Sequence, residues 1–356
     1  MPELDDLLQY AADLDASDLF IRAHARPAIR LHGRIKVTEF DVLTPDETRA
    51  IAYSRMSGRQ IEEFDRHHEM DLAFTFREIY RIRSSIYMQR GTVGMANRLI
   101  PMRIRSLEEL GMPPTLAEFT KSRNGLVLVT GPTGSGKSTT LAAMINLINE
   151  SRRVNIVSIE DPIEYVHQDK MAIISQREVG IDTDSFQEAL KRVLRQAPDV
   201  ILIGEMRDIE TMNVALQAAE TGHLVFATVH TSSAAETLDR LSNMFAPHER
   251  PMLWLRLSIS LRGVVSQKLL PRADGQGRVA AVEVMVVTPT IAKMLEEGKS
   301  EDIYSQIRQA GQETYWGMQT MNQCLVKYFK AGYITEEEAV LNAGNLTELK
   351  QMIRRP

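Results

Sequence analysis

The residues with the clearest chemical pattern are 131–138, Gly-Pro-Thr-Gly-Ser-Gly-Lys-Ser, which match the phosphate-binding pattern GxxxxGK[ST]. The apolar run GLVLVT enters this loop and TTLAAMINLI leaves it, which predicts a strand, a loop and a helix whose first N–H groups point at phosphates. We expect Lys137 to reach the β- and γ-phosphates of ATP and the Ser138 hydroxyl to ligate Mg²⁺. A chance glycine-rich turn is the structural alternative, and the flanking strand and helix argue against it. The predicted nucleotide-binding residues are Gly131, Pro132, Thr133, Gly134, Ser135, Gly136, Lys137, Ser138 and Thr139.

Two acidic segments follow predicted strands and supply groups that hydrolysis of a bound nucleotide requires. The run VILIGE ends at Glu205, at the edge of the sheet where open α/β sheets bind ligands, so we interpret Glu205 as the base that orients water. The segment SIEDPIE places Glu160 and Asp161 where they are expected to hold Mg²⁺, and Glu164 where it is expected to complete the water shell. A solvated strand-end glutamate and a surface turn built on Asp-Pro are the respective alternatives.

Histidines and arginines form a third group of candidates. His223 and His230 bracket an apolar strand, and their odd spacing of seven places them on opposite faces. His230, at the carboxyl end, is the better placed of the two to sense a γ-phosphate, although a lone strand histidine is often structural. Arg81 and Arg83 share one face of a strand, from which they are predicted to act as arginine fingers on a neighbour's phosphates. A solvated basic strand face is the alternative.

The elements that must position these residues divide into two predicted domains. Residues 1–103 begin with a short amphipathic helix and continue with alternating apolar and polar runs, the pattern of a small α+β domain. Residues 104–356 contain short, nearly continuous apolar runs separated by helical stretches, the pattern of a mainly parallel sheet covered by helices on both faces. A proline-containing stretch near residue 104 suits an interdomain connector, and the tail from about residue 250 is predicted to be mostly helical.

Composition and charge exclude several classes. The net charge of −5 gives no global attraction to nucleic acid or anionic lipid, so no direct nucleic-acid partner is expected. The single cysteine, Cys324, excludes an intrachain disulfide and a zinc site built on paired cysteines, which is typical of a reducing compartment. The N-terminus lacks the basic and apolar segments of an export signal. We therefore expect a cytoplasmic protein that contacts membrane only through partners.

The order of these motifs resembles the secretion ATPases of type II secretion and type IV pili, and among them the pilus retraction ATPases. The segments that carry the resemblance are GPTGSGKSTT, IEDPIEYVH, QREVG, LRQAPDVILIGEMRD and AAETGHLVFATVHT, with ASDLFIRAHARPAIRLHGRI near the N-terminus and GMQTMNQCL near the C-terminus. The resemblance implies an α/β fold with a RecA-like P-loop ATPase domain and a smaller N-terminal α+β domain that is PAS-like. It also implies an Asp box at Glu160, Asp161 and Glu164, a Walker B carboxylate at Glu205 and a His box that includes His230.

The resemblance further implies a homohexameric motor, peripheral at the inner membrane, that acts on a pilus platform protein and drives pilus retraction. Assembly ATPases of this superfamily commonly carry a four-cysteine module, so a single cysteine favours retraction. One departure is the stretch TIAKMLEE (290–297), which replaces the family's AIRNLIRE and lacks both of its arginines. An accessory paralogue, an ATPase for secretion or DNA transfer, and a nucleotide-dependent switch with little turnover remain alternatives.

Overall fold

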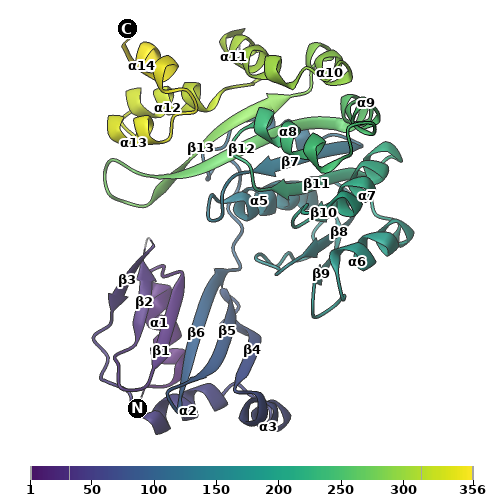
Figure 1. Cartoon of the computed structure of the whole chain (residues 1–356). Helices are drawn as coiled ribbons and strands as arrows, with labels where there is room; N and C mark the ends of the chain where they lie inside the picture. Colours follow the sequence, from purple (N-terminus) through teal and green to yellow (C-terminus); the bar gives the residue numbers. More distant parts are fainter. Residues whose placement is uncertain (1, 32, 314, 355–356) are drawn as a thin grey trace. The chain divides into compact units, whose positions relative to one another are not determined.

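The computed structural model describes residues 2–31, 33–313 and 315–354 (Figure 1). The chain divides into two compact units, residues 1–103 and residues 104–356. Each unit has its own hydrophobic core, and each is described separately.

The described part of the first unit contains a six-stranded antiparallel sheet in the order β3-β2-β1-β6-β5-β4. On β5, Ile82 and Ile86 are buried in the core of this unit, because alternate residues of a strand point to opposite faces. The bounds are α1 Leu4–Asp13, β1 Asp18–Arg22, β2 Ala28–Leu31, β3 Arg34–Val37, α2 Pro45–Tyr53, α3 Gly58–His67, β4 Glu69–Phe76, β5 Tyr80–Gln89 and β6 Thr92–Pro101.

The second unit is built on a seven-stranded sheet in the order β13-β12-β7-β11-β10-β8-β9, counted over its described residues. Every neighbouring pair is parallel except β12 with β13, which is an antiparallel hairpin. The mixed α/β fold with a mainly parallel sheet is therefore confirmed. The bounds of the strands are β7 Gly125–Thr130, β8 Asn155–Glu160, β9 Ile173–Glu178, β10 Val200–Ile203, β11 Leu224–Val229, β12 Leu261–Pro271 and β13 Arg278–Val286.

Helices cover both faces of this sheet, because alternate residues of its strands enter different cores. On β7, Leu126 and Leu128 enter the core shared with α6 to α11, whereas Val127 and Val129 enter the core shared with α4 and α5. The central strands β7, β10 and β11 are therefore almost wholly apolar. The bounds of these helices are α4 Thr115–Thr120, α5 Lys137–Ser151, α6 Phe186–Val193, α7 Ile209–Glu220, α8 Ala234–Met244, α9 Arg250–Ser260, α10 Pro289–Glu296 and α11 Ile303–Glu313, with 3₁₀ turns at Leu194–Gln196 and Ser300–Asp302.

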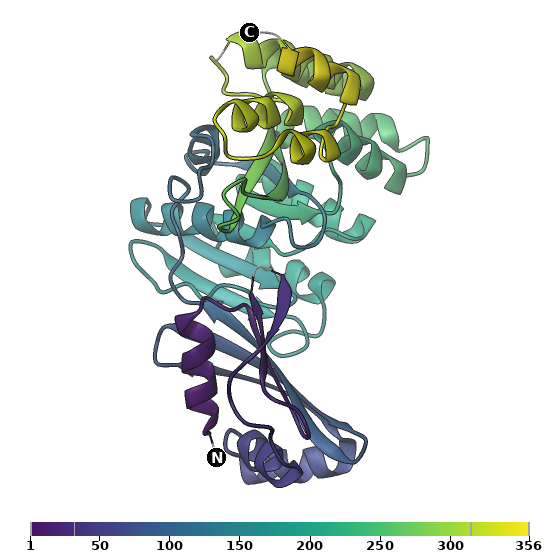
Figure 2. The ribbon, with the colours of Figure 1, turned by 90° about the vertical axis from the view of Figure 1, so that its left-hand side faces the viewer.

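The remaining C-terminal helices form a smaller cluster on β13, at one end of the second unit in both views (Figures 1 and 2). They are α12 Met321–Lys330, α13 Glu336–Leu341 and α14 Leu346–Arg354. The prediction of a mostly helical tail was wrong for residues 261–286, which form the hairpin of β12 and β13. Valine-rich runs make these two strands, and the turn between them contains Gly275 and Gly277 with positive φ, a conformation that glycine adopts without strain.

Within the described ranges, no helix combines the length and the apolar character needed to cross a bilayer.

Candidate functional site: a phosphate loop facing a glutamate and histidine pair

The loop between β7 and α5 curls back on itself, and its glycines make this possible. Gly131, Gly134 and Gly136 have φ angles of 146°, 77° and 88°, which other residues rarely adopt. A Cβ atom at Gly131 would come within 2.3 Å of the carbonyl oxygen of Gln267 on β12. The sequence of the loop therefore follows from its geometry, since a larger residue at position 131 would collide with the neighbouring strand.

Lys137 is the first residue of α5, and its ammonium group lies inside the curve of the loop. Its Nζ atom donates to the carbonyl oxygens of Gly131 at 2.8 Å and Pro132 at 3.0 Å. Burial lowers the pKa of Lys137, and the nearby carboxylates of Glu205 and Glu164 oppose this shift. A buried cation at a helix N-terminus, surrounded by backbone N–H groups, is the arrangement that binds phosphate anions.

A side chain of β12 fixes the loop from outside. Gln267 is 2% exposed, and its amide donates to the carbonyl oxygen of Ser135 at 2.8 Å and accepts from the Thr140 hydroxyl at 2.8 Å. The loop and the first turn of α5 are thus held by one amide group. Gln267 was missed in the sequence because nothing near it in the chain marks its contact with residues more than 120 positions away.

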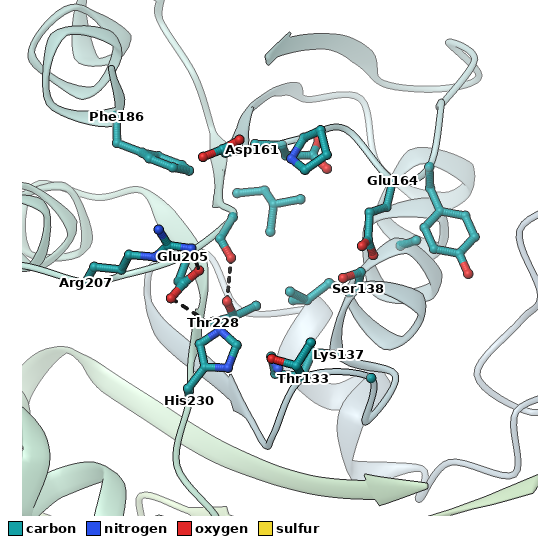
Figure 3. A pocket seen from close by; sticks show the side chains of 18 of the residues that line it. Thr133, Lys137, Ser138, Asp161, Glu164, Phe186, Glu205, Arg207, Thr228 and His230 are labelled. Atoms are coloured by element: carbon teal, nitrogen blue, oxygen red, sulfur yellow. Dashed lines mark hydrogen bonds and ion pairs between the residues drawn. The ribbon is translucent and has the colours of Figure 1, made fainter. Parts of the chain in front are cut away.

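The loop borders a cavity of about 280 Å³ at the carboxyl ends of β8, β10 and β11 (Figure 3). This edge of an open α/β sheet is where ligands bind. The predicted residues that line it are Thr133, Gly134, Lys137, Ser138, Glu160, Asp161, Glu164, Glu205 and His230. The structure thus brings together the loop, both acidic segments and one of the two histidines.

The carboxylate of Glu205 lies between a histidine and an arginine at one side of the cavity (Figure 3). Its Oε1 atom is 3.2 Å from Nε2 of His230, and its Oε2 atom is 2.6 Å from an Nη atom of Arg207. The hydrogen bond from Arg207 is the main cause that lowers the pKa of Glu205, and burial opposes it. Glu205 is therefore ionised at neutral pH, as a group that orients or deprotonates water must be.

We expect the Arg207→Ala substitution to move the acidic limb of the pH profile of kcat/KM to higher pH. The expected role of Glu205 requires its ionised form, so activity should fall as the pH drops through its pKa, and loss of the arginine should raise that pKa. Phosphate release measured across pH checks this. Arg192→Ala is the control, because Arg192 pairs only loosely with Glu188 on exposed helix surface. An unchanged acidic limb in Arg207→Ala would show that Glu205 does not control it.

The three carboxylates at the end of β8 and just after it differ in their hydrogen bonding. Glu160 accepts hydrogen bonds from the Ser158 hydroxyl at 2.7 Å and from the Gln176 amide at 3.1 Å, and burial raises its pKa. Asp161 and Glu164 reach the cavity without such bonds to the strand among the contacts described. The described residues hold no cluster of three or more histidine, cysteine or acidic side chains suited to a metal. A hydroxyl with one or two carboxylates still fits Mg²⁺, which usually takes its other ligands from phosphates and water.

Several residues of the cavity escaped sequence reasoning. Tyr165 shares a hydrogen bond with the hydroxyl of Thr139 at 2.8 Å, which joins the acidic segment to α5. Thr228 donates to the carbonyl oxygen of Gly204 and so ties β11 to the turn that carries Glu205. Phe186, from the start of α6, is an apolar wall. Arg207 had a readable signal, because it lies two residues after Glu205 in the quoted segment GEMRD.

Two predicted groups lie elsewhere. His223 hydrogen-bonds to the carbonyl oxygen of Ala218 at 2.9 Å, at the opposite end of β11 from His230. Arg81 and Arg83 belong to β5 of the first unit, where Arg83 is the cross-strand neighbour of Arg98. Ile82 between them is fully buried, so the two arginines share the other face of the strand.

Comparisons with known proteins agree with this arrangement. A family described as "Type II/IV secretion system protein" matches residues 4–327. The Pseudomonas aeruginosa "Type IV pilus ATPase PilU" is 41% identical over 99% of this chain and 91% of its own length. The "Type IV pilus retractation ATPase PilT" of the same organism is 43% identical over 95% of this chain and 97% of its own length. A crystal structure of "the Pilus Retraction Motor PilT and Bound ADP" superposes with a TM-score of 0.89, at 42% identity, over 99% of this chain and 100% of its own.

Proposed function

Because the chain belongs to the family of type II/IV secretion system proteins, we propose that it is an ATPase motor that drives retraction of a type IV pilus and thereby twitching motility. The observation that carries the proposal is the cavity in which the phosphate loop faces the pair of Glu205 and His230. The assignment of ATP as substrate and of pilus retraction as the work rests on relatives of nearly the same length. These relatives are named for pilus retraction, and one of them has bound ADP.

The roles of the residues follow from their positions. Lys137 and the N–H groups of the loop hold the phosphates of ATP. Ser138, with Asp161 and Glu160, would hold Mg²⁺, which would supply positive charge to offset the negative charge of the phosphates. Glu205 orients the attacking water, His230 fixes the carboxylate of Glu205 and senses the γ-phosphate, and Glu164 completes the water shell opposite them (Figure 3).

We infer that six copies form a ring in which each nucleotide is shared by two subunits. Arg207 is engaged with Glu205, so a further cation for the developing charge would have to come from elsewhere. Arg81 and Arg83 on β5 of a neighbouring copy are proposed to supply it. The mass of the particle in solution, with and without ATP, tests this. A six-fold assembly supports the ring, and a stable monomer under both conditions contradicts it.

The partner is proposed to be the platform protein of the pilus at the inner membrane. The motor would work from the cytoplasm as a peripheral protein, and no direct contact with nucleic acid is proposed. The net charge of −5 agrees with a protein partner rather than a nucleic acid.

An accessory role beside a second retraction motor is the first alternative, because α10 carries Ala292 and Glu296 where the resemblance would place arginines. The relatives named PilU and PilT match at nearly equal identity. Co-purification distinguishes a pilus platform from a secretion or DNA-transfer channel. A nucleotide switch is distinguished by phosphate release, which would be negligible in the purified protein.

Deletion of the gene is expected to abolish or slow the retraction of type IV pili, because the motor would no longer convert ATP hydrolysis into withdrawal of the fibre. Time-lapse imaging of fluorescent pili measures this directly. Complementation with the wild-type gene is the control. Unchanged retraction in the deletion strain would remove the proposed role in retraction and leave the ATPase activity to be explained by another system.

A further inference from the structure

Glu283 on β13 is a buried carboxylate that contacts two separate helices. Its side chain accepts a hydrogen bond from the backbone N–H of Ala234 at 2.8 Å through Oε1, and a longer one from that of Met321 at 3.4 Å through Oε2. The residue is 2% exposed. A buried carboxylate is costly unless its oxygens are hydrogen-bonded, so these two N–H donors stabilise Glu283 in its buried position.

Both donors are the first residues of their helices. Ala234 opens α8 after the N-cap residue Ser233, and Met321 opens α12 after the N-cap residue Thr320. Helix N-termini carry partial positive charge, which favours a carboxylate between them. Burial raises the pKa of Glu283, and the two N–H groups oppose this shift. The side chain of Glu283 thus connects the first residue of α8 with the first residue of α12.

The helix α8 leads directly back to the nucleotide site. The hydroxyls of Thr231 and Thr237 are 2.7 Å apart, and Thr237 also bonds to the carbonyl oxygen of Ser233 at 2.7 Å. Arg240, further along α8, donates to the carbonyl oxygen of His230 at 2.8 Å. The chain at the carbonyl group of His230 and just after it is therefore held by α8, and His230 in turn contacts Glu205 at 3.2 Å.

We propose that Glu283 is a positioning residue that sets the start of α8 and through it places His230 against Glu205. Since the same carboxylate holds the start of α12, the geometry of the catalytic pair depends on the C-terminal helices. Glu283 itself does not line the cavity. The inference rests on the proposed ATPase function.

The Glu283→Gln variant tests this, because glutamine keeps the shape but presents an NH₂ group to one of the two N–H donors. We expect kcat for phosphate release to fall about tenfold, the scale of one lost hydrogen bond to a charged group, with the KM for ATP unchanged. Asp199→Asn is the control: Asp199 also accepts a hydrogen bond from a backbone N–H, that of Asn155 at 2.8 Å, but at the amino end of β8 and away from both α8 and the cavity, so kcat should not change. Wild-type kcat in Glu283→Gln would overturn the proposal.

A double variant separates positioning from general damage. In a His230→Ala background, Glu283→Gln should lower kcat no further, because its effect runs through His230. If the fold-losses in kcat of the two single variants multiplied in the double variant, the two residues would act independently and the proposal would be overturned.

If Glu283→Gln fails to fold, Ala234→Pro decides. Proline removes the N–H that donates to Glu283 and suits the first position of a helix. It follows Ser233, whose φ of −150° and ψ of 164° are extended, as the residue before a proline requires. A folded Ala234→Pro variant should show the same fall in kcat, and wild-type kcat there would overturn the proposal. Absence of phosphate release by the wild-type protein would instead refute the ATPase function.

Discussion

Replacing Glu205 by glutamine should lower ATP turnover by about three orders of magnitude while ATP still binds. A general base or water-orienting carboxylate contributes roughly 10²–10⁴-fold, and glutamine has no negative charge with which to accept a proton. The phosphate loop does not include Glu205, so the affinity for ATP should change little. Phosphate release and equilibrium binding of a fluorescent ATP analogue measure the two effects separately.

A control for this variant lies on the following helix. Glu210→Gln removes a carboxylate that is exposed and pairs with Lys191 on the surface, and it should leave turnover unchanged. If Glu205→Gln retained wild-type turnover, the base would have to be sought on the other side of the cavity, where Glu164 is the first candidate.

Replacing Lys137 by alanine should abolish measurable ATP binding at concentrations that saturate the wild-type protein. Its ammonium group lies inside the loop, the residue as a whole is 8% exposed, and charge-assisted hydrogen bonds to phosphate are each worth about 1.5–3 kcal/mol. The loss of two such bonds corresponds to at least about a hundredfold in affinity. Isothermal titration with ATP checks the change.

The fold should survive this substitution, because among the described residues the hydrogen bonds of Lys137 go only to two carbonyl oxygens of its own loop and join it to no other element. Lys121→Ala is the control, since Lys121 pairs with Glu118 on exposed surface. Retained ATP binding by Lys137→Ala would mean that the loop amides alone hold the phosphates, and the assigned role of Lys137 would be wrong.

The part of the site that could be predicted from sequence is the part that is local or follows from neighbouring strands. The loop at 131–138 lies between a strand and a helix that are adjacent in the chain, so the pattern that reveals it is contained within residues 125–151. Glu205 and His230 lie 25 residues apart, but β10 and β11 are parallel neighbours whose carboxyl ends meet. The pattern of a buried strand followed by a polar residue was therefore enough to predict that Glu205 and His230 lie at the same edge of the sheet.

The remainder depends on tertiary contacts that leave no local pattern. Gln267 is an ordinary strand residue until β12 docks beside β7. The hairpin itself was misread as helix, because apolar runs of this length do not distinguish a strand from a buried helix segment. Arg207 is the exception, because it lies two residues after Glu205 on the turn that follows β10, so its contact with Glu205 is local.

The pairing of β12 with β7 also determines when, during synthesis of the chain, the phosphate loop can become able to bind nucleotide. The amide of Gln267 that fixes the phosphate loop is contributed from 132 residues beyond Ser135. A nascent chain that has left the ribosome only as far as α9 contains the whole loop sequence but not the strand that braces it. Nucleotide binding should therefore be acquired late in synthesis, after β12 has paired, and the loop should be exposed to proteases until then.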